Sequence, residues 1–384
     1  MDVFDSVHGQ IFICPKAKEI IDTKEFQRLR NIKQLGAIYQ VFTGASHNRF
    51  EHSIGVYYLA RSYMDILNKY FQYFSDKEYE LISIGALIHD IGHGPFSHLF
   101  DEFIKINEHE YRSIGLFKYM NSKYNFGYTS LELDFIYNVI YPKNIVNDKK
   151  YLYQIVSNSN GIDVDRMDYI IRDTKMTGLN YGIEYHRIMN NTIIYENELQ
   201  YDIKCKTAIE AFFATRYILY KEICNHRTVI SIENHIKEIL TEIDEVFGIT
   251  KCIKEDDWEK FILLTDNIIY SIQFMEDDRL LKAKEILNDM YDRKIYKLVG
   301  EIVSDSKLDI ESPNKNIIID HKKITYHSLE LPKYINTNRY HNINDNLQVH
   351  KDEYITKILC KDKNNIEANE LLKIFSINLR LRND

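Results

Sequence analysis

The sequence has few cysteines, prolines and glycines, and it has no long apolar run. Its 384 residues include 5 Cys, 5 Pro and 14 Gly. The odd number of widely spaced cysteines, without a Cys-x-x-Cys motif, argues against a disulfide framework or a thiolate zinc site. No stretch approaches the ~18 apolar residues of a membrane span, so no membrane partner is expected. The chain opens Met1-Asp2 without a basic, apolar leader, and we expect a cytoplasmic protein, with the nucleus left open.

Composition and charge are those of a folded, acidic protein. Hydrophobic residues make up 45% and charged residues 28%, and 49 basic against 57 acidic side chains leave a net charge of −8. This balance excludes a disordered chain and argues against a general nucleic-acid coat. A local basic face at Lys24–Lys33 leaves single-stranded nucleic acid open as a side partner. The length predicts two or three domains, or one large domain with an appendage.

Apolar residues recur with the 3.6-residue period of a helix through most of residues 16–240. Gln27, Arg28, Arg30 and Lys33 are expected on the solvent face of the first helix. The predicted elements are a helix from the Asp22-Thr23 cap to Gly36, a helix from Phe50 to Tyr70, a buried helix from Asp76 to His89, a loop at Asn138–Asn160, and helices beginning near Val164 and Thr207.

The pattern changes beyond Gly300. Ile317–Ile319 and Ile324–Tyr326 alternate with polar turn residues, which predicts short strands. Residues 368–381 form the pattern of a last helix. We therefore predict a mostly α protein, with a helical domain at residues 1–300 and a smaller α+β lobe at residues 301–384.

Several polar residues fall where the pattern predicts burial. His52 lies on the apolar stripe of its helix, and His89-Asp90 end a helix with almost no polar face. Burying such groups costs several kcal/mol unless a partner compensates them. A divalent metal would compensate all of them, and imidazole with carboxylate suits Fe, Mn or Zn rather than Ca²⁺. Taken singly, His52 also fits an ordinary core histidine, and a His-Asp pair arises by chance.

Histidines are concentrated just after this helix. His93, His98 and His109 follow His89 within a short segment. His98 and Asp101 stand at i, i+3, a spacing that lets a carboxylate orient an imidazole on one helical turn.

A second acidic cluster contains Asp163, Asp165, Asp168 and Asp173. Asp165 and Asp168 share a helical face. The cluster fits either metal ligands or a solvated helix start whose acids favour the N-terminal dipole. Spacing alone does not decide which aspartate reaches a metal.

The order His…His-Asp…Asp resembles the HD phosphohydrolase superfamily. Longer strings of the sequence resemble the deoxynucleoside triphosphate triphosphohydrolases of that superfamily, and most closely the catalytic core of the metazoan members that carry a sterile-alpha-motif domain. The likeness covers residues 1 to about 300 strongly and the last lobe loosely, and we expect no counterpart of the sterile-alpha-motif domain. The strings are Asp22–Arg30, Ile32–Gly36, Gly44–Ser53, His89–His98, Ile155–Asn158, Gly161–Tyr169 and Leu264–Asn267.

The resemblance implies a helical HD-domain bundle and a metal-dependent reaction. Its four ligands would be His52, His89, Asp90 and Asp165, holding one Fe, Mn or Zn ion, with Mg²⁺ accompanying the nucleotide phosphates. The implied reaction is attack on the α-phosphorus of a dNTP, which releases inorganic triphosphate and a deoxynucleoside. Proton transfer to the leaving oxygen falls to His98, held by Asp101, and His93 and His109 would line the phosphates and share that role.

The resemblance also implies substrate contacts. Arg49, Arg166 and Arg216 would clamp the phosphates, with Tyr169 donating a hydrogen bond. Gln34 and Asp173 match contacts to the sugar 3′-hydroxyl, and Leu35 matches the residue beneath the sugar. Two departures stand out: Cys224-Asn225 replaces a Tyr-Gln pair against sugar and base, and Arg166 replaces a lysine.

Relatives of this kind are activated by guanine nucleotide at a subunit interface, which assembles a tetramer. Asp202 stands where the second effector site has an arginine, and Met1 replaces a lysine. We therefore expect GTP or dGTP activation with an altered second, dNTP-binding effector site, and self-association to a dimer or tetramer. The matching residues are Asp22, Gln27, Arg30, Arg293 and Lys297 for the guanine nucleotide, and Arg187 and Lys204 for the second site. The guanine-nucleotide positions also fit an ordinary charged helix face.

Two alternatives stay open. One is another HD enzyme, a phosphodiesterase or nucleotidase that acts on cyclic or monophosphate nucleotides. The other is a nucleotide sensor or nucleic-acid-binding module without catalysis. The presence of all four ligand positions and His98 argues against the second, because a dead site has no need to keep buried charges together.

Overall fold

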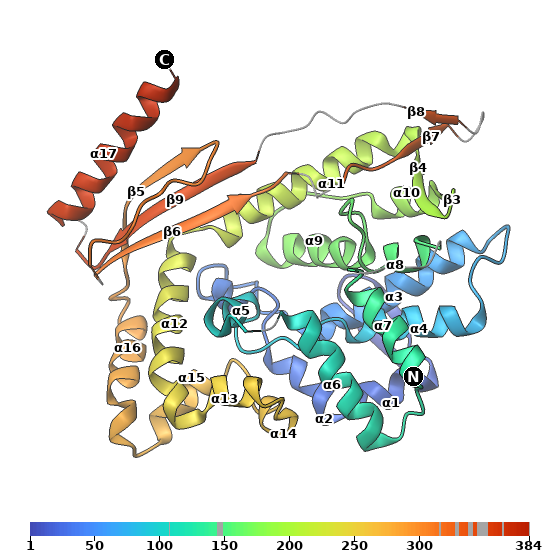
Figure 1. Cartoon of the computed structure of the whole chain (residues 1–384), viewed down its shortest axis with the longest axis horizontal. Helices are drawn as coiled ribbons and strands as arrows, with labels where there is room; N and C mark the ends of the chain where they lie inside the picture. Colours follow the sequence, from blue (N-terminus) through green and yellow to red (C-terminus); the bar gives the residue numbers. More distant parts are fainter. Residues whose placement is uncertain are drawn as a thin grey trace.

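Helices fill most of the molecule, and a three-stranded sheet lies toward one end of it (Figure 1). The computed structural model describes residues 1–106, 108–143, 149–314, 316–326, 330–336, 341–343, 352–362 and 365–383. The predicted fold class, mostly α with a smaller part that mixes strands and a helix, is confirmed. None of the helices in the described ranges combines the length and hydropathy that a bilayer crossing requires.

The helical part begins after a short hairpin and continues to residue 291. Its α-helices are α1 (Pro15–Ile21), α2 (Lys24–Gln27), α3 (Arg49–Leu67), α4 (Asp76–Ile88), α5 (His98–Ile104), α6 (His109–Tyr124), α7 (Ser130–Ile140), α8 (Tyr151–Gln154), α9 (Val164–Thr177), α10 (Tyr185–Asn190), α11 (Lys206–Ile218), α12 (Arg227–Phe247), α13 (Ile249–Lys254), α14 (Trp258–Phe261), α15 (Ile268–Ser271) and α16 (Leu281–Tyr291). Tighter or wider turns are η1 (Arg28–Asn31), η2 (Gly36–Gln40), η3 (Ile203–Cys205), η4 (Leu219–Cys224), η5 (Ile272–Phe274) and η6 (Asp278–Leu280).

Local sequence explains where the two central helices begin. Asn48 caps α3, because its side chain accepts a hydrogen bond from the backbone N–H of Glu51. Ser75 and Glu78 form a reciprocal capping box at the start of α4, one residue before the predicted cap at Asp76. The last eight residues of α4 are all buried, as its nearly unbroken apolar pattern predicts.

The first predicted helix is much shorter than expected. Thr23 caps α2 as predicted, but the chain tightens into η1 after one turn. The solvent-facing position predicted for Arg28 is wrong, because its guanidinium is buried and donates to backbone carbonyls of distant segments. The three acceptors are the carbonyl oxygens of Ile91, His93 and Leu264. Arg28 thus fixes the loop that follows α4.

The predicted loop at Asn138–Asn160 is wrong in part. Helix α7 continues to Ile140, and α8 forms a further turn within the range. Tyr151, Leu152 and Val156 are buried in the second hydrophobic core, alongside residues of α3 and α9. Polar neighbours mask this apolar run in the sequence, and burial of the run is what orders it.

The strands form three small sheets. They are the hairpin β1 (Asp2–Asp5) and β2 (Gly9–Phe12), the sheet of β3 (Thr192–Tyr195), β4 (Glu198–Asp202), β7 (Tyr334–Asn336) and β8 (His341–Ile343), and the sheet of β5 (Lys297–Ser304), β9 (Glu353–Cys360) and β6 (Ile317–Ile324). In the last sheet β9 is central and antiparallel to both neighbours. Helix α17 (Ile366–Asn383) lies against β5 on the outer side of that sheet (Figure 1).

The predicted strand at Ile317–Ile319 and the predicted last helix are confirmed, since β6 and α17 cover them. The predicted strand at Ile324–Tyr326 is wrong, because β6 runs on as one strand from Ile317 and ends at Ile324. Strand β5 begins at Lys297 and runs past residue 300. The lobe boundary at residue 300 therefore stays a prediction.

Candidate active site

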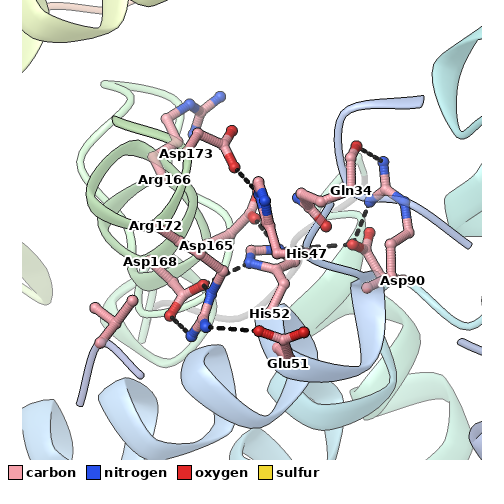
Figure 2. A network of polar contacts seen from close by, with 12 residues as sticks. Gln34, His47, Glu51, His52, Asp90, Asp165, Arg166, Asp168, Arg172 and Asp173 are labelled. Atoms are coloured by element: carbon pink, nitrogen blue, oxygen red, sulfur yellow. Dashed lines mark hydrogen bonds and ion pairs between the residues drawn. The ribbon is translucent and has the colours of Figure 1, made fainter. Parts of the chain in front are cut away.

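Three helices bring three potential metal ligands to one point. His52 comes from α3, His89 follows the last turn of α4, and Asp165 lies in the first turn of α9. His52 Nε2 lies 3.2 Å from His89 Nε2 and 3.1 Å from Asp165 Oδ1, and His89 Nε2 lies 3.5 Å from the same oxygen. One potential ligand atom of each residue lies within 4.8 Å of those of the other two. Figure 2 shows His52 between Asp165 and Asp90.

Asp90 lies on the other side of His52 from Asp165 and is the fourth member of the group (Figure 2). Its Oδ2 lies 3.6 Å from His52 Nε2, and its Oδ1 lies 3.5 Å from His89 Nε2. Arg49 forms a buried ion pair with Asp90 and donates to Ser97 Oγ at 2.7 Å. Burial opposes ionisation, but the Arg49 guanidinium holds the pKa of Asp90 well below its usual range.

Hydrogen bonds behind the two imidazoles determine where their lone pairs point. His89 Nδ1 lies 2.8 Å from the carbonyl oxygen of Ala86, which can only accept, so Nδ1 is the donor. His52 Nδ1 likewise faces a carboxylate, with Asp168 Oδ2 at 2.7 Å. In neutral rings both Nε2 lone pairs are therefore directed at the carboxylates of Asp90 and Asp165.

This donor set fits a divalent transition metal. Two imidazole lone pairs and two carboxylates face one another, and no proton donor lies between them unless the rings are charged. A cation relieves this repulsion, and mixed nitrogen and oxygen ligands suit Fe, Mn or Zn. The site favours positive charge, as the pKa of His52 shows. Burial lowers this pKa, but hydrogen bonds to Asp165 and Asp168 outweigh burial and raise the pKa of His52 to about 10.

A second cluster of histidines lies beside the first. His93, His98, His109 and Asp101 have potential ligand atoms within 4.8 Å of one another. Asp101 accepts from His109 Nδ1 at 3.0 Å and forms an ion pair with Arg112, whereas His98 Nδ1 lies 3.8 Å from Asp101. Asp101 therefore lies against both His98 and His109, and its closer contact is with His109, which the i, i+3 spacing could not indicate.

The rings of this cluster differ in environment. His93 is buried and stacks on His109 with 3.8 Å between ring centres, while the His98 side chain is 69% exposed. Burial and the nearby Arg49 charge keep the pKa of His93 well below its usual range. His93 is thus neutral at neutral pH, whereas the His98 ring is open to solvent.

Both clusters open into a cavity of about 580 Å³. All four predicted metal ligands and three of the four predicted catalytic residues line it, Asp101 being the exception among the described residues. The nine residues predicted to bind substrate also line it, namely Gln34, Leu35, Arg49, Arg166, Tyr169, Asp173, Arg216, Cys224 and Asn225.

Protein partners hold the cationic residues of this cavity in place. Arg166 forms an ion pair with Asp163, the cap of α9. Arg216 donates to Tyr169 Oη at 3.2 Å and to the carbonyl of Thr325 at 3.0 Å. These arginines are therefore positioned before any anion arrives, which lowers the cost of binding one.

Other predicted residues have partners that the sequence did not indicate. Asp173 accepts from His47 Nε2 at 2.7 Å, and both side chains are buried. Cys224 and Asn225 stand at the end of η4, a wide turn of π-helical type between α11 and α12. Such turns recur at functional sites, because they redirect the side chains that follow them.

Sequence analysis missed the residue that orients His52. Asp168 shares a helical face with Asp165 but turns to the opposite side of His52, where Arg172 and His8 also bond it. The backbone approaches this carboxylate closely, since a Cβ on Gly55 would lie 1.9 Å from Asp168 Oδ1. The i, i+3 spacing of the two aspartates was the available signal, but it could not assign their roles.

Charged residues from distant segments also line the cavity, and no motif indicated them. Glu102 comes from α5 and Glu233 from α12. Lys322 and Lys323 come from β6, so the C-terminal sheet contributes to the cavity.

The predicted effector residues lie in two regions. Near α2, Arg30 Nε donates to Gln27 Oε1 at 2.8 Å, and Asp22 pairs with Lys18. Arg293 Nη2 lies 3.4 Å from the carbonyl of Gln40. Lys297 is exposed and opens β5. In the second predicted site, Arg187 donates to the carbonyl of Lys204 at 3.0 Å, and Lys204 lies 3.6 Å from Asp202.

Comparison with known proteins agrees with this geometry. The HD domain family matches residues 49–173, which contain all four convergent residues. An HD domain-containing protein of Acanthamoeba polyphaga mimivirus is 36% identical over 77% of this chain and 72% of its own length. The chain belongs to the HD-domain family.

Two further relatives of this HD-domain chain have a named activity. The deoxynucleoside triphosphate triphosphohydrolase SAMHD1 of Homo sapiens is 35% identical over 80% of this chain and 56% of its own length. Its homologue of the same name in Dictyostelium discoideum is 33% identical over 78% of this chain and 60% of its own length. The chain thus spans less than two thirds of the length of each of these two relatives. The resemblance to the deoxynucleoside triphosphate triphosphohydrolases, inferred from the motifs, is confirmed.

Proposed function

We propose that this chain is a metal-dependent dNTP triphosphohydrolase, which cleaves a dNTP to a deoxynucleoside and inorganic triphosphate. The observation that carries the proposal is the convergence of His52, His89, Asp90 and Asp165 at a cavity that also presents fixed arginines. The names of the similar triphosphohydrolases support the substrate class.

Each part of the cavity has a role in this reaction. A divalent metal held by the four convergent residues would act as a Lewis acid toward phosphate oxygen and lower the pKa of water. Arg49, Arg166 and Arg216 would neutralise the triphosphate and hold it in one orientation. His98 is the proposed donor to the leaving 5′-oxygen, because its imidazole lines the cavity and is open to solvent. His109, held by Asp101, and His93 would flank the phosphates.

The remaining lining residues are assigned to the nucleoside. Gln34 and Asp173 offer hydrogen bonds to a sugar hydroxyl, and Leu35 offers an apolar surface beneath the ring. Cys224 and Asn225 would lie along sugar and base, and Tyr169 would donate to the phosphates together with Arg216. Mg²⁺ would accompany the phosphates.

Products distinguish this function from the two alternatives. Metal-quantified protein incubated with dGTP should release one inorganic triphosphate for each deoxyguanosine, as measured by ion chromatography and liquid chromatography. Release of orthophosphate or cleavage of cyclic or monophosphate nucleotides instead would favour another HD enzyme. Absence of any product despite bound metal would favour a sensor or nucleic-acid-binding module.

We further propose activation by guanine nucleotide at a subunit interface. Arg30 supports this role, because it is exposed and its guanidinium stacks over Phe50 at 3.6 Å while its Nε is held by Gln27. Gln27 also donates to the carbonyl of Ile21, the residue before Asp22, and Arg293 and Lys297 lie on a separate exposed segment. Each of these two groups would form half of a guanine-nucleotide site, and self-association to a dimer or tetramer would join the halves. Arg187 and Lys204 would form an altered second effector site.

Sedimentation velocity tests this regulation. Adding GTP and dATP should shift the protein to a larger species and raise dGTP hydrolysis several-fold, since a joined site gains binding energy from both subunits. Arg30→Ala should remove both effects, whereas Arg279→Ala, an exposed arginine paired with Asp277, should retain them. An unchanged oligomer together with GTP-independent hydrolysis would contradict the regulatory proposal and leave the hydrolase proposal intact.

A further inference from the structure

One acidic side chain of the cavity has no partner. Glu233, on α12, lines the cavity and makes no hydrogen bond or ion pair with any described residue. Other carboxylates that line the cavity are held, Asp90 by Arg49, Asp163 by Arg166 and Asp173 by His47. A half-buried carboxylate without a partner is costly, which is a reason to look for a ligand that satisfies it.

Glu233 lies at the end of the cavity that is lined by α5, α12 and β6, together with Glu102 and Lys322. The charged groups that most affect it are Lys322 and Glu102, followed by Lys237 and Asp320, and none of them is a clamp arginine or a convergent ligand. Arg166, in contrast, is influenced by Asp165 and Tyr169, near the metal ligands. A triphosphate with up to four negative charges is drawn to the three arginines, which leaves the base of the nucleotide to face the end with Glu233.

This end of the cavity offers a ligand both a hydrogen-bond donor, Lys322, and an acceptor, Glu233. Lys322 Nζ bonds Glu102 at 2.8 Å, which holds one ammonium near the Glu233 carboxyl and leaves further N–H groups for a ligand. Burial raises the pKa of Glu233 to about 7, partly offset by Lys322, so a cationic or N–H donor neighbour would ionise it. The end therefore offers two acceptor oxygens beside one donor.

We propose that Glu233 and Lys322 read the base of the substrate and give the enzyme a preference for guanine. Guanine alone among the four bases presents two adjacent N–H donors, at N1 and N2, which a carboxylate accepts bidentately, and its O6 accepts from an ammonium. Adenine and cytosine offer one amino group beside a ring acceptor, and thymine offers one N–H. The proposal rests on the proposed hydrolysis and names its favoured substrate.

A competition assay tests the proposal. Wild-type protein and Glu233→Gln are given equimolar dGTP, dATP, dCTP and dTTP with saturating GTP throughout, so that effector occupancy is constant, and the four deoxynucleosides are quantified. We expect dGTP to be preferred by the wild type and its kcat/KM relative to dTTP to fall about tenfold in Glu233→Gln, since one carbonyl replaces a bidentate acceptor. Glu245→Gln, an exposed position on the same helix, should leave the ratios unchanged.

The ratios separate base reading from stability, because loss of folded protein lowers all four rates equally. Equal ratios in the wild type and Glu233→Gln, or a fall that is largest for dCTP, would overturn the guanine assignment while hydrolysis stands. If no dNTP yields triphosphate, the hydrolase proposal fails. Equilibrium binding of dGTP and dTTP to the two proteins then still tests base reading, because the preference for dGTP should be lost in Glu233→Gln.

Discussion

Asp165→Ala is expected to lower the bound metal from one ion per chain to near zero and dNTP hydrolysis by at least about a thousandfold. A single oxygen, Asp165 Oδ1, lies near both imidazole nitrogens, at 3.1 Å from His52 Nε2 and 3.5 Å from His89 Nε2. Its removal leaves two imidazoles and one carboxylate, the latter already paired with Arg49. Metal content by plasma mass spectrometry and triphosphate release measure the two effects.

The fold should survive this change. The Asp165 side chain is 35% exposed to the cavity, so alanine leaves no void in the core. Asp134→Ala, on the exposed face of α7, is the matched control and should retain both metal and turnover. A stoichiometric metal and unchanged turnover in Asp165→Ala would refute the assignment of the site.

The sequence indicated regular elements well where one pattern extends over several turns. Helices α3 and α4 follow from their apolar period and their polar caps. The predictions are wrong where a contact between distant segments determines the local structure. Nothing near Arg28 shows that its guanidinium will be buried against three distant carbonyls, and the apolar run around Leu152 is ordered by a core assembled from other segments.

The same distinction holds at the site. His52, His89, Asp90 and Asp165 could be predicted because buried polar groups on apolar faces demand compensation, and because the motifs resemble a known family. The contacts that orient the site residues could not be predicted, since they depend on how each helix is rotated about its axis. Asp101 lies closer to His109 than to His98, and residues such as Lys322 enter the cavity from a sheet far along the chain.

Asp168→Asn is expected to cost about 3–5 kcal/mol of stability, because it breaks a buried charge network. Each carboxylate oxygen of Asp168 accepts twice: Oδ2 from His52 and Arg172, and Oδ1 from His8 and Arg172. Asparagine has one oxygen, so its amide N–H must face a guanidinium N–H whichever way it is turned. Arg172 would keep one hydrogen bond to the amide oxygen, and Asp5, at 2.9 Å, would be its closest carboxylate among the described residues.

The midpoint of guanidinium-induced unfolding measures this loss of stability, and a substitution of a surface carboxylate serves as the control. Asp134→Asn removes a 3.9 Å pair with Lys118 on an exposed face and should shift stability by less than about 0.5 kcal/mol. Because Asp168 also fixes the His52 ring through Nδ1, the folded fraction of Asp168→Asn should bind metal about 10–100-fold more weakly, as loss of outer partners does at other metal sites. A variant as stable as the control, with wild-type metal affinity, would mean that Asp168 neither supports the fold nor orients His52.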